Sequence, residues 1–135
     1  MRTHLRRTAD KLGLAFGDRR MTFNSRRAQE LGKWAEAQGR GEAFHRAVFQ
    51  AYFADGLNIA RVPVLKTIAA AAGLRGDDIE AVLTRGDFSE FVDRDWARSH
   101  AMGVNAVPTF VIDGRRLVGA QTYAALAGLV QPFYD

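Results

Sequence analysis

Residues that could bind a substrate surround Pro108. This proline lies between Val107 and the β-branched and aromatic segment Thr109–Ile112. An X-Pro peptide bond can be cis at modest cost, and a native cis proline is usually functional or sits in a tight turn. A trans proline that opens a strand, where a missing N–H is tolerated, is the simpler alternative. The residues around Pro108, taken alone, favour that trans proline.

A second candidate is Gly119-Ala120-Gln121, which leads into an apolar segment with helical spacing. A helix N-terminus presents free N–H groups and a partial positive charge, so it can hold a carboxylate. An ordinary strand-to-helix turn is the alternative. Asn58 follows the turn Asp55-Gly56, where a turn or cap role is the commoner one for asparagine.

Thiol chemistry is excluded within these 135 residues, because the sequence has no cysteine. The three histidines (His4, His45 and His100) lack metal-ligand spacing, so no metal site is expected. Asp93 and Asp95 are two residues apart on a predicted helix and do not face each other. We therefore expect no catalytic residue in this chain.

The elements that position these residues are mostly helices. Leu5, Ala9 and Leu12 have helical spacing, and Asn24 or Ser25 can cap a helix that ends at Gly39. Further helices are predicted over 42–54, from Pro63 to Gly73, from Asp77 and from Asp87 to Gly103. The residues expected to face inward include Trp34, Phe44, His45 (half-buried), Val48, Phe49, Tyr52, Phe53, Phe88, Phe91, Val92 and Trp96.

The C-terminal part of the sequence has the pattern of two β-strands, unlike the helical pattern before it. Asp113-Gly114 is a strong hairpin turn between the strands 109–112 and 115–118. A final helix from about Gln121 to Val130 is expected to turn Tyr123, Leu126, Leu129 and Val130 inward. A lone hairpin is at best marginally stable in water, so part of a sheet is expected to be missing.

Charge and composition fit one globular domain, with 47% hydrophobic and 25% charged residues. Residues 1–27 hold eight Lys/Arg and two Asp, hence 8 − 2 = +6, while the remainder holds eleven Lys/Arg and thirteen Asp/Glu, hence 11 − 13 = −2. We assign the arginines mostly to solvated helix faces, so a nucleic-acid partner is not expected. No apolar run is long enough for a membrane span, and a cytoplasmic location is expected.

Two blocks carry a family resemblance. The pattern G-V-x-x-V-P-T-F over 103–110, then the D-G hairpin and V-G-A-Q, resembles the cis-proline loop and third core strand of the DsbA family. The block N-S-R-R-A-Q-E-L at 24–31, with A-F-H-R-A-V-F-Q-A-Y-F at 43–53 and N-I at 58–59, resembles the helical insertion of its FrnE-like branch. Related families are the 2-hydroxychromene-2-carboxylate isomerases and the kappa-class glutathione transferases.

The resemblance implies an α/β thioredoxin-like fold of DsbA type, here mostly α-helical. It implies one partial domain over 1–135, with a helical insertion over about 20–102 and the cis-proline loop, hairpin and last helix over 103–135. The first βαβ unit, with its C-x-x-C helix, would lie outside this sequence. Ser25 does not take the place of the serine that the isomerases and transferases carry there.

The resemblance also assigns roles to particular residues. It implies a cis bond before Pro108, with the backbone N–H and C=O of Val107 offered to an extended peptide or a thiol substrate. No cofactor is expected, with glutathione at Asn58, Ala120 and Gln121 as the alternative ligand. The predicted function is a dithiol–disulfide oxidoreductase relative that is inactive in redox chemistry alone. The alternatives are a glutathione-dependent isomerase or transferase relative and a non-catalytic module that binds peptides or forms a homodimer.

Overall fold

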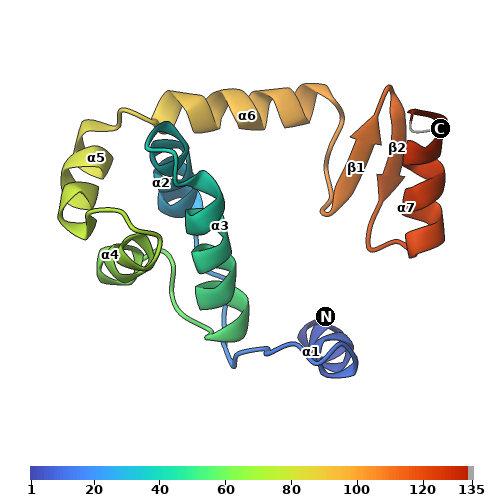
Figure 1. The fold of residues 1–135 in the computed structure, drawn as a ribbon, viewed down its shortest axis with the longest axis horizontal. Coiled ribbons are helices and arrows are strands. Elements are labelled where there is room, and N and C mark those ends of the chain that lie inside the picture. The colour runs from blue at the N-terminus through green and yellow to red at the C-terminus, as the bar shows by residue number, and fades with distance from the viewer. Residues whose placement is uncertain (134–135) are drawn as a thin grey trace. The chain divides into compact units, whose positions relative to one another are not determined.

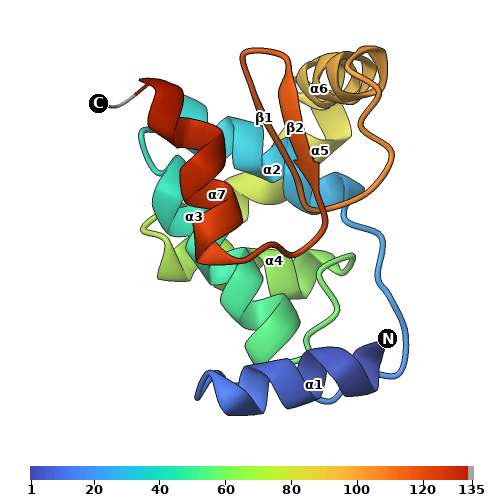
Figure 2. The same cartoon turned by 90° about the vertical axis from the view of Figure 1, so that its right-hand side faces the viewer.

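The structure, a computed structural model, describes residues 1–133 and divides into two compact units, Met1–Asp93 and Arg94–Asp135. The division falls inside one helix, α6. The described elements, drawn in Figures 1 and 2, are α1 (Arg2–Lys11), α2 (Arg26–Ala37), α3 (Gly41–Phe49), α4 (Val62–Ala71), α5 (Ile79–Arg85), α6 (Ser89–Ala101), β1 (Thr109–Ile112), β2 (Arg115–Val118) and α7 (Tyr123–Val130).

The core of the first unit lies among α2, α3, α4 and α5. Each of these helices contributes side chains at three- and four-residue spacing, so that one face of each is apolar. Leu31, Phe44, Leu65 and Ile79 are completely buried there. Trp34 is buried with them, as predicted.

A π-helical turn continues α3 over Gln50–Ala54, where Asp55 N–H donates to Gln50 C=O at 3.0 Å. The sequence predicted a helix over 42–54 and no change of winding within it. Such π turns hold an extra residue and occur often at functional sites. This one places Tyr52 and Phe53 side by side, with ring centroids 4.8 Å apart.

The segment after α1 is seated against this turn by a close backbone approach. Gly17 N–H donates to Phe53 C=O at 2.7 Å. A Cβ on Gly17 would lie 2.5 Å from the backbone nitrogen of Gly56, closer than real Cβ contacts. Glycine is therefore required at Gly17 by space, not by its φ angle.

The second unit contains the only sheet in the part of the chain that is described. β1 pairs with β2 antiparallel, from Thr109 opposite Val118 to Ile112 opposite Arg115. Asp113 and Gly114 both have positive φ, 45° and 74°, as a two-residue type I′ turn requires. The predicted hairpin is confirmed, and Figure 1 shows α7 beside β2.

Several apolar residues that helical spacing placed inward are exposed instead. Half of Trp96 and 88% of Tyr123 are accessible to solvent. The other corrections are Phe49 and Phe53, Phe91 in α6 and Val130 in α7. Spacing identifies the apolar face of a helix, but only another element packed on that face buries it. No helix among residues 1–133 is both long and apolar enough to cross a membrane.

Candidate functional site

The loop before β1 presents Val107 to solvent. The Val107–Pro108 peptide bond is cis, and Val107 is 90% exposed. Two hydrogen bonds fix the loop: Thr109 Oγ1 donates to Ala106 C=O at 2.7 Å, and Gly119 N–H donates to Pro108 C=O at 2.8 Å. Within residues 1–133, the N–H and C=O of Val107 have no hydrogen-bond partner. The loop therefore has a fixed shape and leaves these two backbone groups available to a ligand.

The turn at Gly119-Ala120-Gln121 lies beside this loop, because Gly119 bonds to Pro108 and Val118 pairs with Thr109. The Gln121 side chain donates to Val118 C=O at 2.7 Å, so its amide N–H is engaged at the strand end. Ala120 is exposed and offers only backbone polar groups. The structure thus brings together four of the five predicted site residues.

The start of α7 has a side-chain cap that the sequence analysis did not assign. Thr122 precedes the helix and its Oγ1 accepts from Ala125 N–H at 3.2 Å. A threonine before an apolar helical run is an ordinary N-cap signal, and it could have been found from the sequence. The cap satisfies one of the N–H groups that a carboxylate would otherwise use.

Asn58, the fifth predicted residue, belongs to the first unit. Its Oδ1 accepts from Ala60 N–H at 3.0 Å, and its C=O accepts from Arg61 N–H at 3.2 Å. These bonds form a turn that leads into α4. The side-chain oxygen of Asn58 therefore has a local structural role.

Two adjacent arginines on β2, also missed from the sequence, hold the hairpin to helix ends. Arg115 donates to the carbonyls of Gly128 and Leu129 at 3.3 Å each, at the C-terminal end of α7. Arg116 donates to Gly103 C=O at 3.2 Å and to Met102 C=O, just after α6. Cations suit helix C-termini, where carbonyls lack partners.

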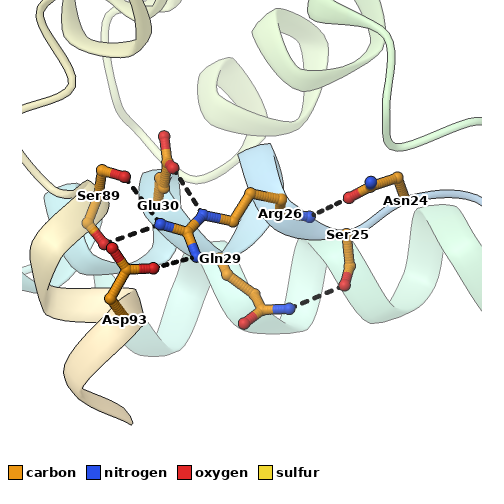
Figure 3. A network of polar contacts seen from close by, with 7 residues as sticks. All are labelled: Asn24, Ser25, Arg26, Gln29, Glu30, Ser89 and Asp93. Carbon is orange, nitrogen blue, oxygen red and sulfur yellow. Dashed lines mark hydrogen bonds and ion pairs between the residues drawn. The ribbon is translucent and has the colours of Figure 1, made fainter. Parts of the chain in front are cut away.

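A polar cluster in the first unit surrounds Arg26 at the start of α2 (Figure 3). Its guanidinium donates to Glu30 at 2.8 Å, to Asp93 at 2.7 Å, and to the hydroxyl and carbonyl oxygens of Ser89 at 2.7 and 2.9 Å. Its backbone N–H donates to Asn24 Oδ1 at 2.8 Å, which confirms that the Asn24-Ser25 pair begins the helix. Only 23% of the Arg26 side chain is exposed, so the solvated role expected for arginines is wrong here.

The Arg26 cluster is structural rather than catalytic. The hydrogen bond to Asp93, followed by the one to Glu30, raises the pKa of Arg26 above its ordinary value. A guanidinium that is always protonated cannot serve as a base. The cluster instead ties the first turn of α6 to α2. Asp93, predicted to lie on a solvated face, is the partner on α6.

Residues 1–133 contain no group of three or more His, Cys, Asp or Glu side chains that could hold a metal ion. A family model described as a DSBA-like thioredoxin domain matches residues 1–131. The chain belongs to the DsbA-like thioredoxin domain family. The predicted fold class is confirmed: the described part of this DsbA-like chain is mostly helical with a two-stranded antiparallel sheet.

A solved structure that is named as a DsbA oxidoreductase agrees with the family assignment, and one curated protein is also similar. The crystal structure of a probable DsbA oxidoreductase from Streptomyces coelicolor is similar with a TM-score of 0.86 and 27% identity, over 99% of this chain. The uncharacterized protein YwbO of Bacillus subtilis (strain 168) is 31% identical over 90 residues, which are 64% of this chain. The DsbA-like chain covers 59% of the first and 44% of the second.

Proposed function

We propose that this chain holds the substrate in a DsbA-like dithiol–disulfide oxidoreductase of the FrnE-like branch, with the reacting thiols supplied from outside these 135 residues. Family membership and the similar oxidoreductase structure support the class of reaction. Disulfide exchange needs a thiolate that attacks a sulfur, and the sequence has no cysteine. The chain alone is therefore inactive in redox chemistry.

The observation that carries the proposal is the exposed, unpaired backbone of Val107. An extended peptide can add to such a segment by main-chain hydrogen bonds, which give affinity without demanding a particular sequence. Because Thr109 and Gly119 fix the loop through bonds of 2.7 and 2.8 Å, little ordering is needed on binding.

The binding test uses the S-carboxymethylated insulin B chain as an extended probe. Amide NMR shifts at Val107 and Thr109 report its binding. Val107→Ala keeps both backbone groups, while Val107→Pro removes the N–H, so binding weakens by about tenfold only in the proline variant. Equal binding by the two variants, or shifts confined to other residues, contradicts the proposal.

The source of the thiols has a separate test. In an insulin reduction assay the chain alone stays at background. The genomic reading frame ahead of Met1 is then examined for an encoded strand and a Cys-x-x-Cys motif. Such a motif in frame or in a neighbouring gene supports the oxidoreductase, whereas none in either place counts heavily against it. A cytoplasmic location belongs to the same proposal, and fractionation of cells that express the tagged chain tests it.

A glutathione-dependent relative has weaker support. Of the three residues assigned to glutathione, Asn58 and Gln121 use their side chains within the protein at 3.0 and 2.7 Å. Thr122 also occupies one N–H at the start of α7. Retention of the chain on immobilised glutathione, with elution by millimolar free ligand, would restore this reading.

A non-catalytic dimerising module is the second candidate, and the hairpin favours it. A two-stranded sheet leaves an unpaired edge on each strand, and such edges pair with other chains. Val111 and Val118 share one face of the hairpin by register and both are exposed. Light scattering measures whether the chain dimerises, and hydrogen exchange measures the protection of the hairpin amides. A monomer whose hairpin is strongly protected would contradict this second candidate function.

A further inference from the structure

The first unit contains an apolar cavity of about 330 Å³ that the proposed function does not use. It lies between the segment before α2, the helix α2 itself, and α3 with its π turn. Its apolar wall is formed by Phe23, Val48, Phe49, Tyr52, Phe53 and Ile59. The volume falls at the lower end of the range for small-molecule sites, which are typically lined by such rings with a few polar groups.

Arg19 lies against two rings of this wall. Its guanidinium carbon is 4.0 Å from the Tyr52 ring centroid and 5.8 Å from that of Phe53. One guanidinium nitrogen donates to the Tyr52 hydroxyl at 2.5 Å, and the same nitrogen is 3.4 Å from Met21 C=O. Within residues 1–133, no carboxylate pairs with Arg19. Arg19 is not one of the residues that line the cavity, but this partly buried cation without a counter-ion contacts two rings that do.

Arg19 also lines a second hollow of about 340 Å³, which is strongly basic. Arg2, Arg6, Arg19 and Arg20 line it, against one carboxylate, Asp18. Asp18 pairs with Arg6 at 3.5 Å and is 95% exposed, so it offsets little of this charge. Concave surfaces lined by one sign of charge concentrate ligands of the opposite sign.

Two other polar side chains of the cavity wall, Gln29 and His45, are already engaged. Gln29 Nε2 donates to Ser25 Oγ at 2.8 Å, and His45 Nε2 lies 3.3 Å from Glu36. His45 also packs on Gly32, where an added Cβ would meet its ring at 2.9 Å. Thr22 also lines the cavity but is uncharged, so Arg19 is the group that matches an anionic end of a ligand.

We propose that this cavity binds a small amphipathic carboxylate, with the apolar chain among the rings and the carboxylate on Arg19. The guanidinium matches a carboxylate in shape and charge and can donate two parallel hydrogen bonds. The rings supply the apolar contact, and the basic hollow raises the local concentration of anions. The site contains none of the hairpin residues, so binding here and peptide binding at Val107 can fail independently.

The test compares three probes with the same ten-carbon chain: decanoate and decylammonium, each below its micelle concentration, and decanol below its solubility limit. Methyl NMR shifts of Val48 and Ile59 report occupancy of the cavity in the full chain, and Val118 methyls report non-specific binding. Decanoate is expected to bind about tenfold more tightly than decanol, with decylammonium weakest. Equal affinities for decanoate and decanol, or no saturable shift at Val48 and Ile59, overturn the proposal.

Two variants separate the roles of charge and apolar wall. Arg19→Gln lowers the affinity for decanoate to that for decanol, whereas Arg7→Gln, an equal change of charge within α1, leaves it unchanged. Phe49→Ala removes an exposed ring of the wall and weakens both probes alike. Equal effects of Arg19→Gln and Arg7→Gln overturn the assignment to Arg19. Shifts produced by the insulin B-chain probe and not by decanoate would mean that the cavity is a peptide site instead.

Discussion

Arg115 and Arg116 are neighbours on β2 but donate to the C-terminal ends of two different helices, α7 and α6. Successive side chains of a strand point to opposite faces, so a pair of adjacent arginines reaches both faces of the hairpin. In the described part of the chain the sheet has only these two strands, and the two arginines connect it to the ends of the flanking helices. The two attachments can be removed one at a time.

We predict that Arg116→Gln and Arg115→Gln loosen different ends of the second unit. Each loses hydrogen bonds to helix-terminal carbonyls, at a cost of about 1 kcal/mol. Hydrogen exchange should speed up at Gly103 and Val104 in Arg116→Gln, and at Leu129 and Val130 in Arg115→Gln. The same pattern of exchange in both variants would contradict separate attachments.

We predict that Arg26→Met releases the first turn of α6 from α2, while Arg27→Met does not. Arg27 makes one hydrogen bond to the Ala60 carbonyl at 3.1 Å and does not contact Ser89 or Asp93. Amide exchange at Val92 and Asp93 is the measurement. Unchanged protection there in Arg26→Met would show that the cluster is not needed to hold α6.

The raised pKa of Arg26 also fixes how this attachment responds to pH. A cation whose pKa is higher in the folded protein stabilises it fully below the ordinary pKa and loses this contribution only as the pH rises through the raised value. The difference in unfolding free energy between the unchanged protein and Arg26→Met should therefore stay constant from neutral pH to pH ~10. A difference that shrinks within that interval, measured by chemical denaturation at several pH values, would contradict the role given to the Arg26 charge.

Two phenylalanines five residues apart in α3 provide a matched test of the core. Phe44 is completely buried and Phe49 is 61% exposed. Phe44→Ala should lower the free energy of unfolding by about 3–5 kcal/mol, and Phe49→Ala by less than about 1 kcal/mol. Chemical denaturation of the two variants checks the difference, and similar losses would place the core elsewhere.

Two glycine-to-alanine substitutions should change the free energy of unfolding in opposite directions. Gly17→Ala forces the backbone at position 17 away from Gly56. It should therefore destabilise the packing of α1 and the loop after it against the π turn. Gly128→Ala, inside α7 with nothing within 4 Å of the added Cβ, should stabilise by about 0.5–1 kcal/mol. Thermal unfolding and exchange at Gly17 N–H measure the two effects. A stabilising Gly17→Ala would mean that the close approach is not a constraint.

The sequence predicted the elements well because their signals are local. The Asp113-Gly114 turn, the Asn24-Ser25 helix start and the apolar spacing of α2 all act within a few residues. It failed where burial depends on a distant partner, as for Trp96 and Tyr123. The Arg26 cluster was missed for the same reason, since Arg26 and Asp93 are 67 residues apart.

The same distinction applies to the candidate sites: local sequence signals predict one part, and the other part depends on packing between distant residues. Pro108 and the Gly119 turn could be placed together because a hairpin with a known turn length fixes which residues are opposite. The cavity beside Arg19 could not be predicted, since Arg19 and Tyr52 are brought together by packing alone. A change of winding inside a helix likewise left no pattern that spacing rules detect.

Because of the π turn, the directions of the aromatic rings in the cavity wall depend on the number of residues in this segment. A π turn accommodates one residue more than an α-helical turn, so deleting one residue between Gln50 and Ala54 would restore α-helical winding and change the directions of the side chains within that segment. A single lost codon could thus redirect Tyr52 and Phe53 while leaving the composition of the segment almost unchanged. In relatives of this chain, the count of residues between Phe44 and the Asp55-Gly56 turn is therefore a better guide to a shared pocket than the identity of its rings.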